Sequence, residues 1–288
     1  MLIIVGAVIV IVSVIGGYAL PGGHLGVLFQ PFEFMIILGA ALGALLTSNT
    51  KTILAGIGKS FGRMLKGPKH KKDGFGELLS LLHQLFKLAK SKGNLALEKH
   101  IETPEESSLF EQFPLVLADH HAMDFLCDYL RLLTMGSENP HELEALMDQD
   151  LETHHHEETA VASALNAMAD GLPALGIVAA VLGVIHTMGS ITEPPEVLGH
   201  LIGAALVGTF FGILVSYGFV GPMAAALGNI IEADSKFFHC MKAGLLAHVA
   251  GHPPVISVEF ARKTLPTNVR PSFAELEETF DNLPPVAN

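Results

Sequence analysis

Apolar residues gather in four long segments, and this pattern is the strongest signal in the sequence. The segments run from Leu2 to Leu20, Phe34 to Ser48, Leu172 to Met188, and Leu198 to Val220. About 20 helical residues cross a hydrocarbon core ~30 Å thick, so each segment predicts a membrane-spanning helix, the short second one with its flanking residues. The first segment lacks a basic n-region and a small-residue cleavage site, which favours a retained helix over a signal peptide.

The more polar stretches predict further helices and no strand. Three-and-four spacing of apolar residues predicts an amphipathic helix that ends at Gly93, with members Phe75, Leu78, Leu79, Leu82, Phe86 and Ala89. A second helix from Asn94 must stop before Pro104. Capping patterns predict three more helix starts, at Thr103–Glu106, Asn139–Glu142 and Ser272–Glu275. The helix from Asn139 is expected to run toward the third membrane segment, and the Pro284-Pro285 end is expected to be disordered.

Composition agrees with the pattern of segments. Half of the 288 residues are hydrophobic, 16% are charged, and the mean hydropathy is +0.45. Together with the four segments and the helical patterns, these values predict an all-α integral membrane protein with four transmembrane helices and a large helical cytoplasmic domain. The expected organisation is residues 1–49 for transmembrane helices 1 and 2, 50–169 for the cytoplasmic helical domain, 170–222 for transmembrane helices 3 and 4, and 223–288 for a cytoplasmic tail.

Lysine and arginine are distributed asymmetrically, which predicts the orientation. Twelve of the seventeen lie between Lys51 and Arg131, and the other five follow Pro222. By the positive-inside rule the central region, the tail and the N-terminus are cytoplasmic. Cys127 and Cys240 then face a reducing compartment and are predicted to be free, buried thiols. The net charge of −12 argues against nucleic acid as a partner.

Small residues recur four positions apart in the apolar segments. The pairs are Gly39 with Gly43, Gly199 with Gly203, Gly208 with Gly212, and Ala179 with Gly183. Such faces let helix backbones approach closely in lipid, and their number predicts an oligomer or a complex with a partner's helix. Pro173 and Pro222 lie at the predicted cytoplasmic boundary, where spacing alone allows either plain helix ends or a hinge and ion exit. Thr209 is expected to bond back to the preceding turn.

Candidate chemistry is sparse. His154, His155 and His156 with Glu157 and Glu158 could suggest a metal site, but consecutive helical residues point about 100° apart, so a solvated helix face is favoured. No nucleophile elbow, phosphate-binding loop or CxxC spacing occurs. We therefore predict no enzyme activity, no cofactor and no metal. The roles of the three histidines stay open, as do those of His186 and His200, which could be interfacial residues or proton relays.

Eight stretches together carry a resemblance to a known family. They are GGYALPGGHLGVLFQPFEFMIILGAALGA, LALEKHIETPEES, FPLVLADHHAMDFLCDYLRLL, ELEALMDQDLETH, LPALGIVAAVLGVIHTMGS, LIGAALVGTFFGILVSYGFVGP, and VEFARKTL with RPSFAELEE. Over essentially its whole length the chain resembles the motility protein A family, the A subunit of the bacterial flagellar stator. The resemblance implies an inner-membrane protein that forms a pentamer around two B subunits. Each B subunit supplies one helix with the ion-accepting aspartate and a peptidoglycan-binding domain.

The resemblance also assigns roles residue by residue. Lys90 and Glu98 match the two charged positions that act on the rotor's switch protein, although the basic position is often arginine in the family. The family's prolines fall on Pro173 and Pro222, and Thr209 matches a residue near the ion path. Sodium-driven relatives tend to have threonine at the position of Ala180, so the resemblance implies that protons are the transported ion.

Two alternatives come from other classes of protein. The first is an ExbB- or TolQ-like proton channel that energises outer-membrane processes, although such chains usually have three membrane helices. The second is a membrane enzyme that uses the segment from His154 to Glu158. The preferred function is a stator subunit that forms, with a B subunit, a proton channel coupled to torque on the rotor.

Overall fold

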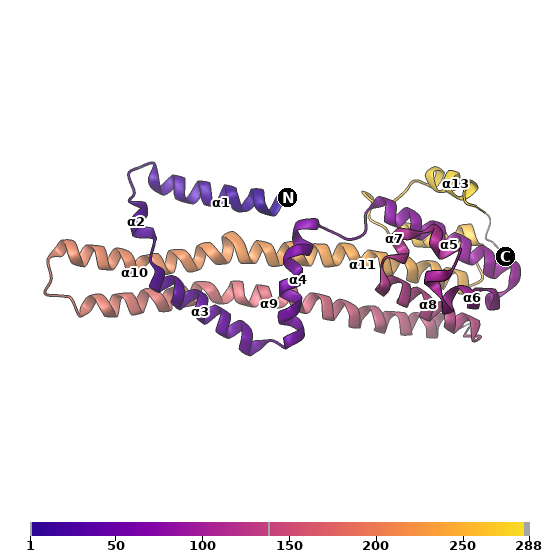
Figure 1. Ribbon diagram of the computed structural model, residues 1–288, viewed down its shortest axis with the longest axis horizontal. Coiled ribbons are helices and arrows are strands. Elements are labelled where there is room, and N and C mark those ends of the chain that lie inside the picture. The colour runs from indigo at the N-terminus through magenta and orange to yellow at the C-terminus, as the bar shows by residue number, and fades with distance from the viewer. Residues whose placement is uncertain (1, 138, 285–288) are drawn as a thin grey trace. The chain divides into compact units, whose positions relative to one another are not determined.

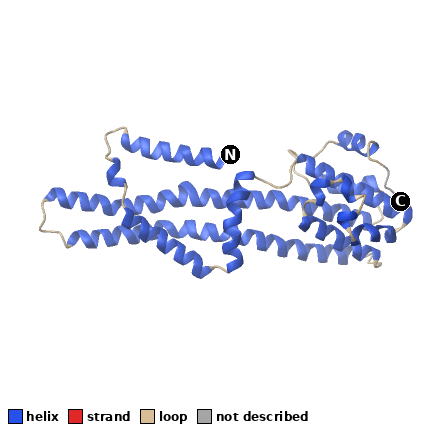
Figure 2. Cartoon of the chain, viewed as in Figure 1, coloured by secondary structure: helices blue, strands red, loops and turns tan. Residues whose placement is uncertain are grey.

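The computed structural model describes residues 2–137 and 139–284, and every regular element in them is a helix (Figures 1 and 2). The all-helical prediction is therefore confirmed. The chain divides into two compact units, the first made of Met1–Gly67 with Glu157–Ile230 and the second of Pro68–His156 with Ile231–Asn288. The predicted domain boundaries refer to the membrane surface and stay a prediction.

The first unit contains the membrane helices. Its elements are α1 (Leu2–Ala19), α2 (Leu25–Leu28), α3 (Pro31–Ser48), α4 (Lys51–Lys66), α10 (Pro195–Val215), the π-helix Ser216–Val220, and parts of α9 (Pro140–Met188) and α11 (Gly221–Val249). Four helical stretches of the described residues are long and apolar enough to cross a membrane. They contain the four predicted segments, except for Leu20 at the end of the first, which confirms the four predicted helices.

Helix α4 follows α3 after two residues and packs across α9 (Figure 1). Its buried residues are Ile57, Ser60 and Met64. The contact is close at Gly56, where an added Cβ would lie 2.8 Å from the Val161 side chain. A side chain at this position would therefore require Val161 or α4 to shift.

The second unit is a helical domain around one apolar core. Its own elements are α5 (Lys72–Lys92), the 3₁₀ helices Asn94–Leu97, Pro104–Glu106 and Phe110–Gln112, α6 (Glu98–Glu102), α7 (Pro114–Leu117), α8 (His120–Thr134), α12 (Pro254–Lys263) and α13 (Phe273–Asp281). Helix α5 forms the centre of this core, and all its residues from 78 to 86 are buried. The predicted amphipathic helix is confirmed, but the polar residues Ser80, His83 and Gln84 in its middle are buried as well.

Most predicted helix ends are observed. Gly93 follows α5 with φ +85°, a conformation that side chains disfavour. A capping box between Ser272 and Glu275 opens α13, with the Ser272 hydroxyl accepting from the Glu275 amide at 3.1 Å. The Asn139 side chain accepts a hydrogen bond from the His141 amide at the start of α9. Pro285 and the residues after it lie outside the described residues.

One predicted cap is wrong. Thr103 makes no side-chain cap, and only a single 3₁₀ turn, Pro104–Glu106, follows it. The chain turns away at Ser107, whose buried hydroxyl accepts from the amides of Leu109 and Phe110. Both of these side chains are fully buried, so core packing replaces the longer helix that the local sequence favours.

Both cysteines are free and buried in the core of the second unit, as predicted. Burial raises the pKa of the Cys127 thiol to about 12, and burial also raises the pKa of Cys240. The two thiols are therefore unreactive in the folded state, because the thiolate is the reactive form.

Candidate functional site

Helices α9 and α10 lie side by side with their backbones in contact (Figure 1). An added Cβ on Gly212 would lie 2.6 Å from the Leu172 carbonyl oxygen, and one on Gly176 would lie 2.9 Å from the Gly208 carbonyl oxygen. Only glycine permits this approach. The predicted pair Gly208 and Gly212 thus packs within the chain, whereas no atom of the described residues lies within 4 Å of an added Cβ on Gly39 or Gly43.

Pro173 lies inside α9 and does not interrupt it. Because proline has no amide hydrogen, it leaves the Ala169 carbonyl, four residues earlier, without its helical donor. The Ser216 hydroxyl donates to this carbonyl oxygen at 2.6 Å from the end of α10. Ser216 is only 1% exposed. This serine was not among the residues that the sequence singled out.

Pro222 is the second residue of α11 and directly follows the π-helix Ser216–Val220. Within that turn the Gly221 amide donates to the Ser216 carbonyl oxygen. A π turn is wider than an α turn and is frequent at functional sites. The sequence predicted continuous helix up to Val220, so this irregular turn is an addition to the prediction.

Ala180 and Thr209 lie on the two facing helices of this pair. An added Cβ on Gly208 would lie 3.3 Å from the Ala180 amide nitrogen, and one on Gly176 would lie 3.3 Å from the Thr209 Cα. Both residues are partly exposed. Within the described part of the chain no acceptor takes the Thr209 hydroxyl, so the predicted back-bond to the preceding turn is absent. The hydroxyl is therefore available to a group from outside this chain.

Lys90 lies in the last turn of α5, where a cation suits the helix dipole. Its side chain is exposed and lines a cleft with Asn94, His248 and His252. Burial, and then the charge of Lys90, lower the pKa of His248. The cleft therefore presents one cation beside a neutral imidazole at neutral pH.

Glu98 is the first residue of α6, eight positions after Lys90. Its side chain is exposed and lines a groove with Leu95, Lys99 and Glu102 among others. In residues 2–137 and 139–284, neither Lys90 nor Glu98 forms an ion pair. The second unit thus holds both predicted rotor-contact residues as solvated charges.

A buried carboxylate fixes the first residues of the second unit. Asp119 accepts from Lys69 Nζ and from His70 Nε2, each at 2.9 Å, and its other oxygen caps α8. Burial alone would raise the pKa of Asp119, but the hydrogen bonds from His70 and Lys69 outweigh it and hold the pKa well below its usual range. Asp234 accepts from the Lys69 amide at 2.7 Å. This cluster orders the chain that leads into α5.

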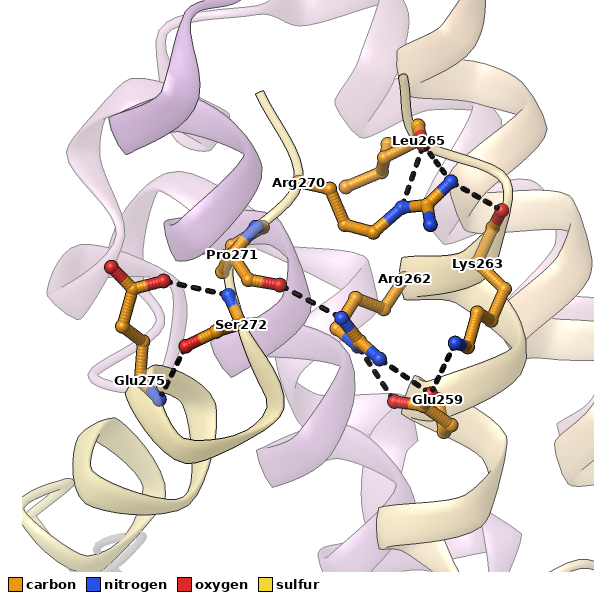
Figure 3. A network of polar contacts seen from close by, with 8 residues as sticks. All are labelled: Glu259, Arg262, Lys263, Leu265, Arg270, Pro271, Ser272 and Glu275. Atoms are coloured by element: carbon orange, nitrogen blue, oxygen red, sulfur yellow. Dashed lines mark hydrogen bonds and ion pairs between the residues drawn. The ribbon is translucent and has the colours of Figure 1, made fainter. Parts of the chain in front are cut away.

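A second polar network holds the tail against the core (Figure 3). Arg262 is buried and donates two hydrogen bonds to Glu259, at 2.6 and 2.7 Å, and one to the Pro271 carbonyl oxygen at 2.9 Å. Arg270 donates to the Leu265 carbonyl oxygen. The network fixes α12 and the start of α13, both of which pack on α5. It therefore supports the helix that carries Lys90.

The three consecutive histidines of α9 diverge. His154 is half-buried, with its ring 5.0 Å from that of Phe238, while His155 and His156 are exposed. Among the described residues no group of three or more histidine, cysteine or acidic side chains is placed to hold a metal ion. His186 and His200 are exposed in the first unit. Their roles stay open.

Comparison with known proteins agrees with this architecture. The family model described as Motility protein A N-terminal matches residues 4–93, and that of the MotA/TolQ/ExbB proton channel family matches residues 118–238. Motility protein A of Salmonella typhimurium is 45% identical, over 96% of this chain and 94% of the relative.

Two solved structures share the fold. The C. jejuni MotAB structure has a TM-score of 0.76 at 21% identity, covering 94% of this chain and 98% of that chain. The flagellar MotAB stator complex from Bacillus subtilis has a TM-score of 0.71 at 23% identity, covering 89% and 92%. At these identities the likeness establishes the fold alone.

Four candidate spans, a close-packed helix pair whose apolar segments carry no charge, and the match over residues 118–238 define a membrane protein of the proton channel class. Within that class, the 45% identity to motility protein A over 96% of the chain identifies the family. The chain belongs to the motility protein A family. This result favours the flagellar stator over the ExbB- or TolQ-like alternative.

Proposed function

We propose that the chain is the A subunit of a proton-driven flagellar stator in the bacterial inner membrane, with both termini cytoplasmic. The membrane segments of α9 and α10, within Leu172–Met188 and Leu198–Val220, form an uncharged wall of the ion path, and a B subunit supplies the helix with the titrating aspartate. The backbone contact between α9 and α10 carries this proposal, because it builds a rigid wall from two segments without an acidic side chain.

The energetics suit a channel that drives a rotation. Protonation neutralises the partner's aspartate in a low-dielectric seam, and a ring of five A subunits can then turn past it. One charge that crosses the membrane potential supplies ~2.3 kcal/mol per 100 mV. Ala180 and the unsatisfied hydroxyl of Thr209 lie on the facing helices of this wall, where they would border the proton's route.

Torque is transmitted through Lys90 and Glu98. Both are exposed and lack ion-pair partners within the described residues, so both are available to complementary charges on the rotor's switch protein. Exposed charge pairs contribute only ~0 to 1 kcal/mol each. Repeated weak contacts of this size suit a sliding engagement better than tight docking.

Deletion of the gene and complementation test the proposal. The chain should restore swimming to a strain that lacks its A subunit, and swimming should persist when external sodium is replaced by potassium. Failure to complement, in cells whose membranes contain the protein, would exclude the stator role. Motility that follows sodium would exclude protons as the ion.

A further inference from the structure

Pro173 leaves one backbone carbonyl of α9 without its helical hydrogen bond, and a single side chain from outside α9 replaces that bond. The missing amide hydrogen leaves the Ala169 carbonyl without an intrahelical donor. A buried carbonyl without a partner is costly in an apolar environment, and proline is tolerated in membrane helices where neighbouring groups satisfy it. The Ser216 hydroxyl, 2.6 Å from the Ala169 oxygen, is that neighbouring group.

The same serine also belongs to the turn before the second proline. Its carbonyl oxygen accepts from the Gly221 amide in the π turn, and Pro222 is the next residue. Ser216 therefore bonds through its side chain to the segment that Pro173 disturbs, and through its backbone to the segment that Pro222 begins.

Local packing explains why a serine fits. Gly212, one turn before Ser216, lets α10 approach so closely that an added Cβ would lie 2.6 Å from the Leu172 carbonyl oxygen. At this separation a two-atom side chain reaches the Ala169 carbonyl. Ser216 is almost completely buried, so water does not reach this carbonyl in its place.

We propose that Ser216 is a positioning residue that couples the two proline segments of the ion-path wall. The inference rests on the proposed function, in which Pro173 and Pro222 have a conformational role. A movement of α9 about Pro173 must either carry Ser216, and with it the π turn before Pro222, or break the hydrogen bond to Ala169. The bond makes the two prolines move as one unit.

A double-mutant cycle on the purified full-length chain tests the coupling. In the native background Ser216→Ala leaves the Ala169 carbonyl without a donor, and the unfolding temperature should fall by about 2 to 5 °C. In a Pro173→Ala background the restored amide bonds to Ala169. There the same Ser216→Ala change should shift the unfolding temperature by less than about 1 °C. Equal falls in both backgrounds would overturn the proposal.

The exposed serine Ser163 is the matched control, because it lies on α9 and makes no hydrogen bond to the described residues. Ser163→Ala should leave the unfolding temperature unchanged in both backgrounds. In cells, Ser216→Ala should lower swimming speed at normal protein levels, and unchanged speed would overturn the coupling role. The cycle on purified protein needs no motor, so its outcome is separate from a failure of complementation.

Discussion

The two units of the chain hold together by different means. In the first unit the membrane helices touch through glycines and backbone atoms, and none of the residues of α1 is buried. One apolar cluster of this unit joins α3 to α9, and its buried members are Ile37, Ala41, Leu172 and Ala179. In the second unit a large apolar cluster surrounds α5, and buried polar groups such as Asp119 and Arg262 are paired with partners.

The second unit covers its own apolar side chains, whereas the first unit depends on groups outside the chain to cover them. The second unit buries its apolar side chains as a water-soluble domain does, so its stability depends on side-chain packing. The first unit exposes apolar side chains on most of its membrane helices, which lipid or other chains must cover. Side-chain truncation should therefore destabilise the second unit most, whereas added atoms should be most harmful in the first.

The largest expected loss of stability follows a side-chain truncation in the second unit. Leu82 is fully buried in α5 and faces Gly244 of α11, whose added Cβ would lie 3.1 Å from Leu82 Cδ1. Leu82→Ala should reduce the free energy of unfolding by about 2 to 5 kcal/mol. Both cysteines are buried in this unit, so pulse labelling of thiols in increasing urea measures its unfolding.

Leu95→Ala is the matched control for this truncation, because Leu95 is 70% exposed in the same unit. It should change the same free energy by less than about 0.5 kcal/mol. Similar effects for the two leucines would contradict the view that the second unit is stabilised by its own core.

The next largest expected loss of stability follows the addition of a methyl group in the first unit. Gly212→Ala places a methyl group against the Leu172 carbonyl and must separate α9 from α10, at a cost of about 1 to 3 kcal/mol. Thermal unfolding of the purified chain in detergent should show the loss. Gly6→Ala is the control, because no described atom lies within 4 Å of its added Cβ. Equal stability of the two variants would show that the glycine contact does not hold the pair.

Local patterns predicted most of the fold but not all of its irregular parts. Hydrophobic segment length located the four spans, and Gly93 and Ser272 marked helix ends, because these signals depend on nearby residues alone. Thr103 has the same local signals, yet its helix is missing because Leu109 and Phe110 are needed in the core. A single sequence does not show where the burial of apolar side chains contributes more to stability than a helix cap does.

The candidate site was predictable in its residue types and not in its contacts. Lys90, Glu98 and the prolines came from the family resemblance. Ser216 was not found, because its role depends on a helix 47 positions away in sequence and on the π turn. One signal was available: a serine or threonine hydroxyl is one of the groups that can satisfy the carbonyl freed by a proline in a membrane helix, and Ser216 is a serine close to Pro222.

A smaller effect is expected for the carboxylate at the start of the second unit. Asp119→Asn keeps the side-chain shape and the cap on α8 but loses the charge that pairs with Lys69 and His70. We expect a loss of about 1 to 2 kcal/mol at pH 7, measured by thiol labelling. Glu77→Gln is the control, because the half-buried Glu77 carboxylate accepts a hydrogen bond from the Leu115 amide and forms no ion pair with the described residues. An equal loss of stability in this variant would contradict a special role for Asp119.

The effect of Asp119 should depend on pH in one direction. Its folded-state pKa lies below the unfolded value, so its contribution is present above about pH 4 and is lost as pH falls through the folded-state pKa. The difference in stability between the native chain and Asp119→Asn should therefore narrow in acid. A constant difference from pH 7 to pH 3 would mean that charge is not the cause.

The smallest effect on stability should accompany a large effect on motility. Lys90 and Glu98 are exposed and form no ion pair with the described residues, so Lys90→Glu or Glu98→Lys should change unfolding by less than about 0.5 kcal/mol. Swimming should nevertheless be impaired, because each reversal turns attraction to the rotor into repulsion. Lys71→Glu, at the exposed residue just before α5 and so at the opposite end of that helix from Lys90, should swim normally. If both reversals swam normally, singly and together, these residues would not transmit torque, and the function of the second unit would lie on another of its surfaces.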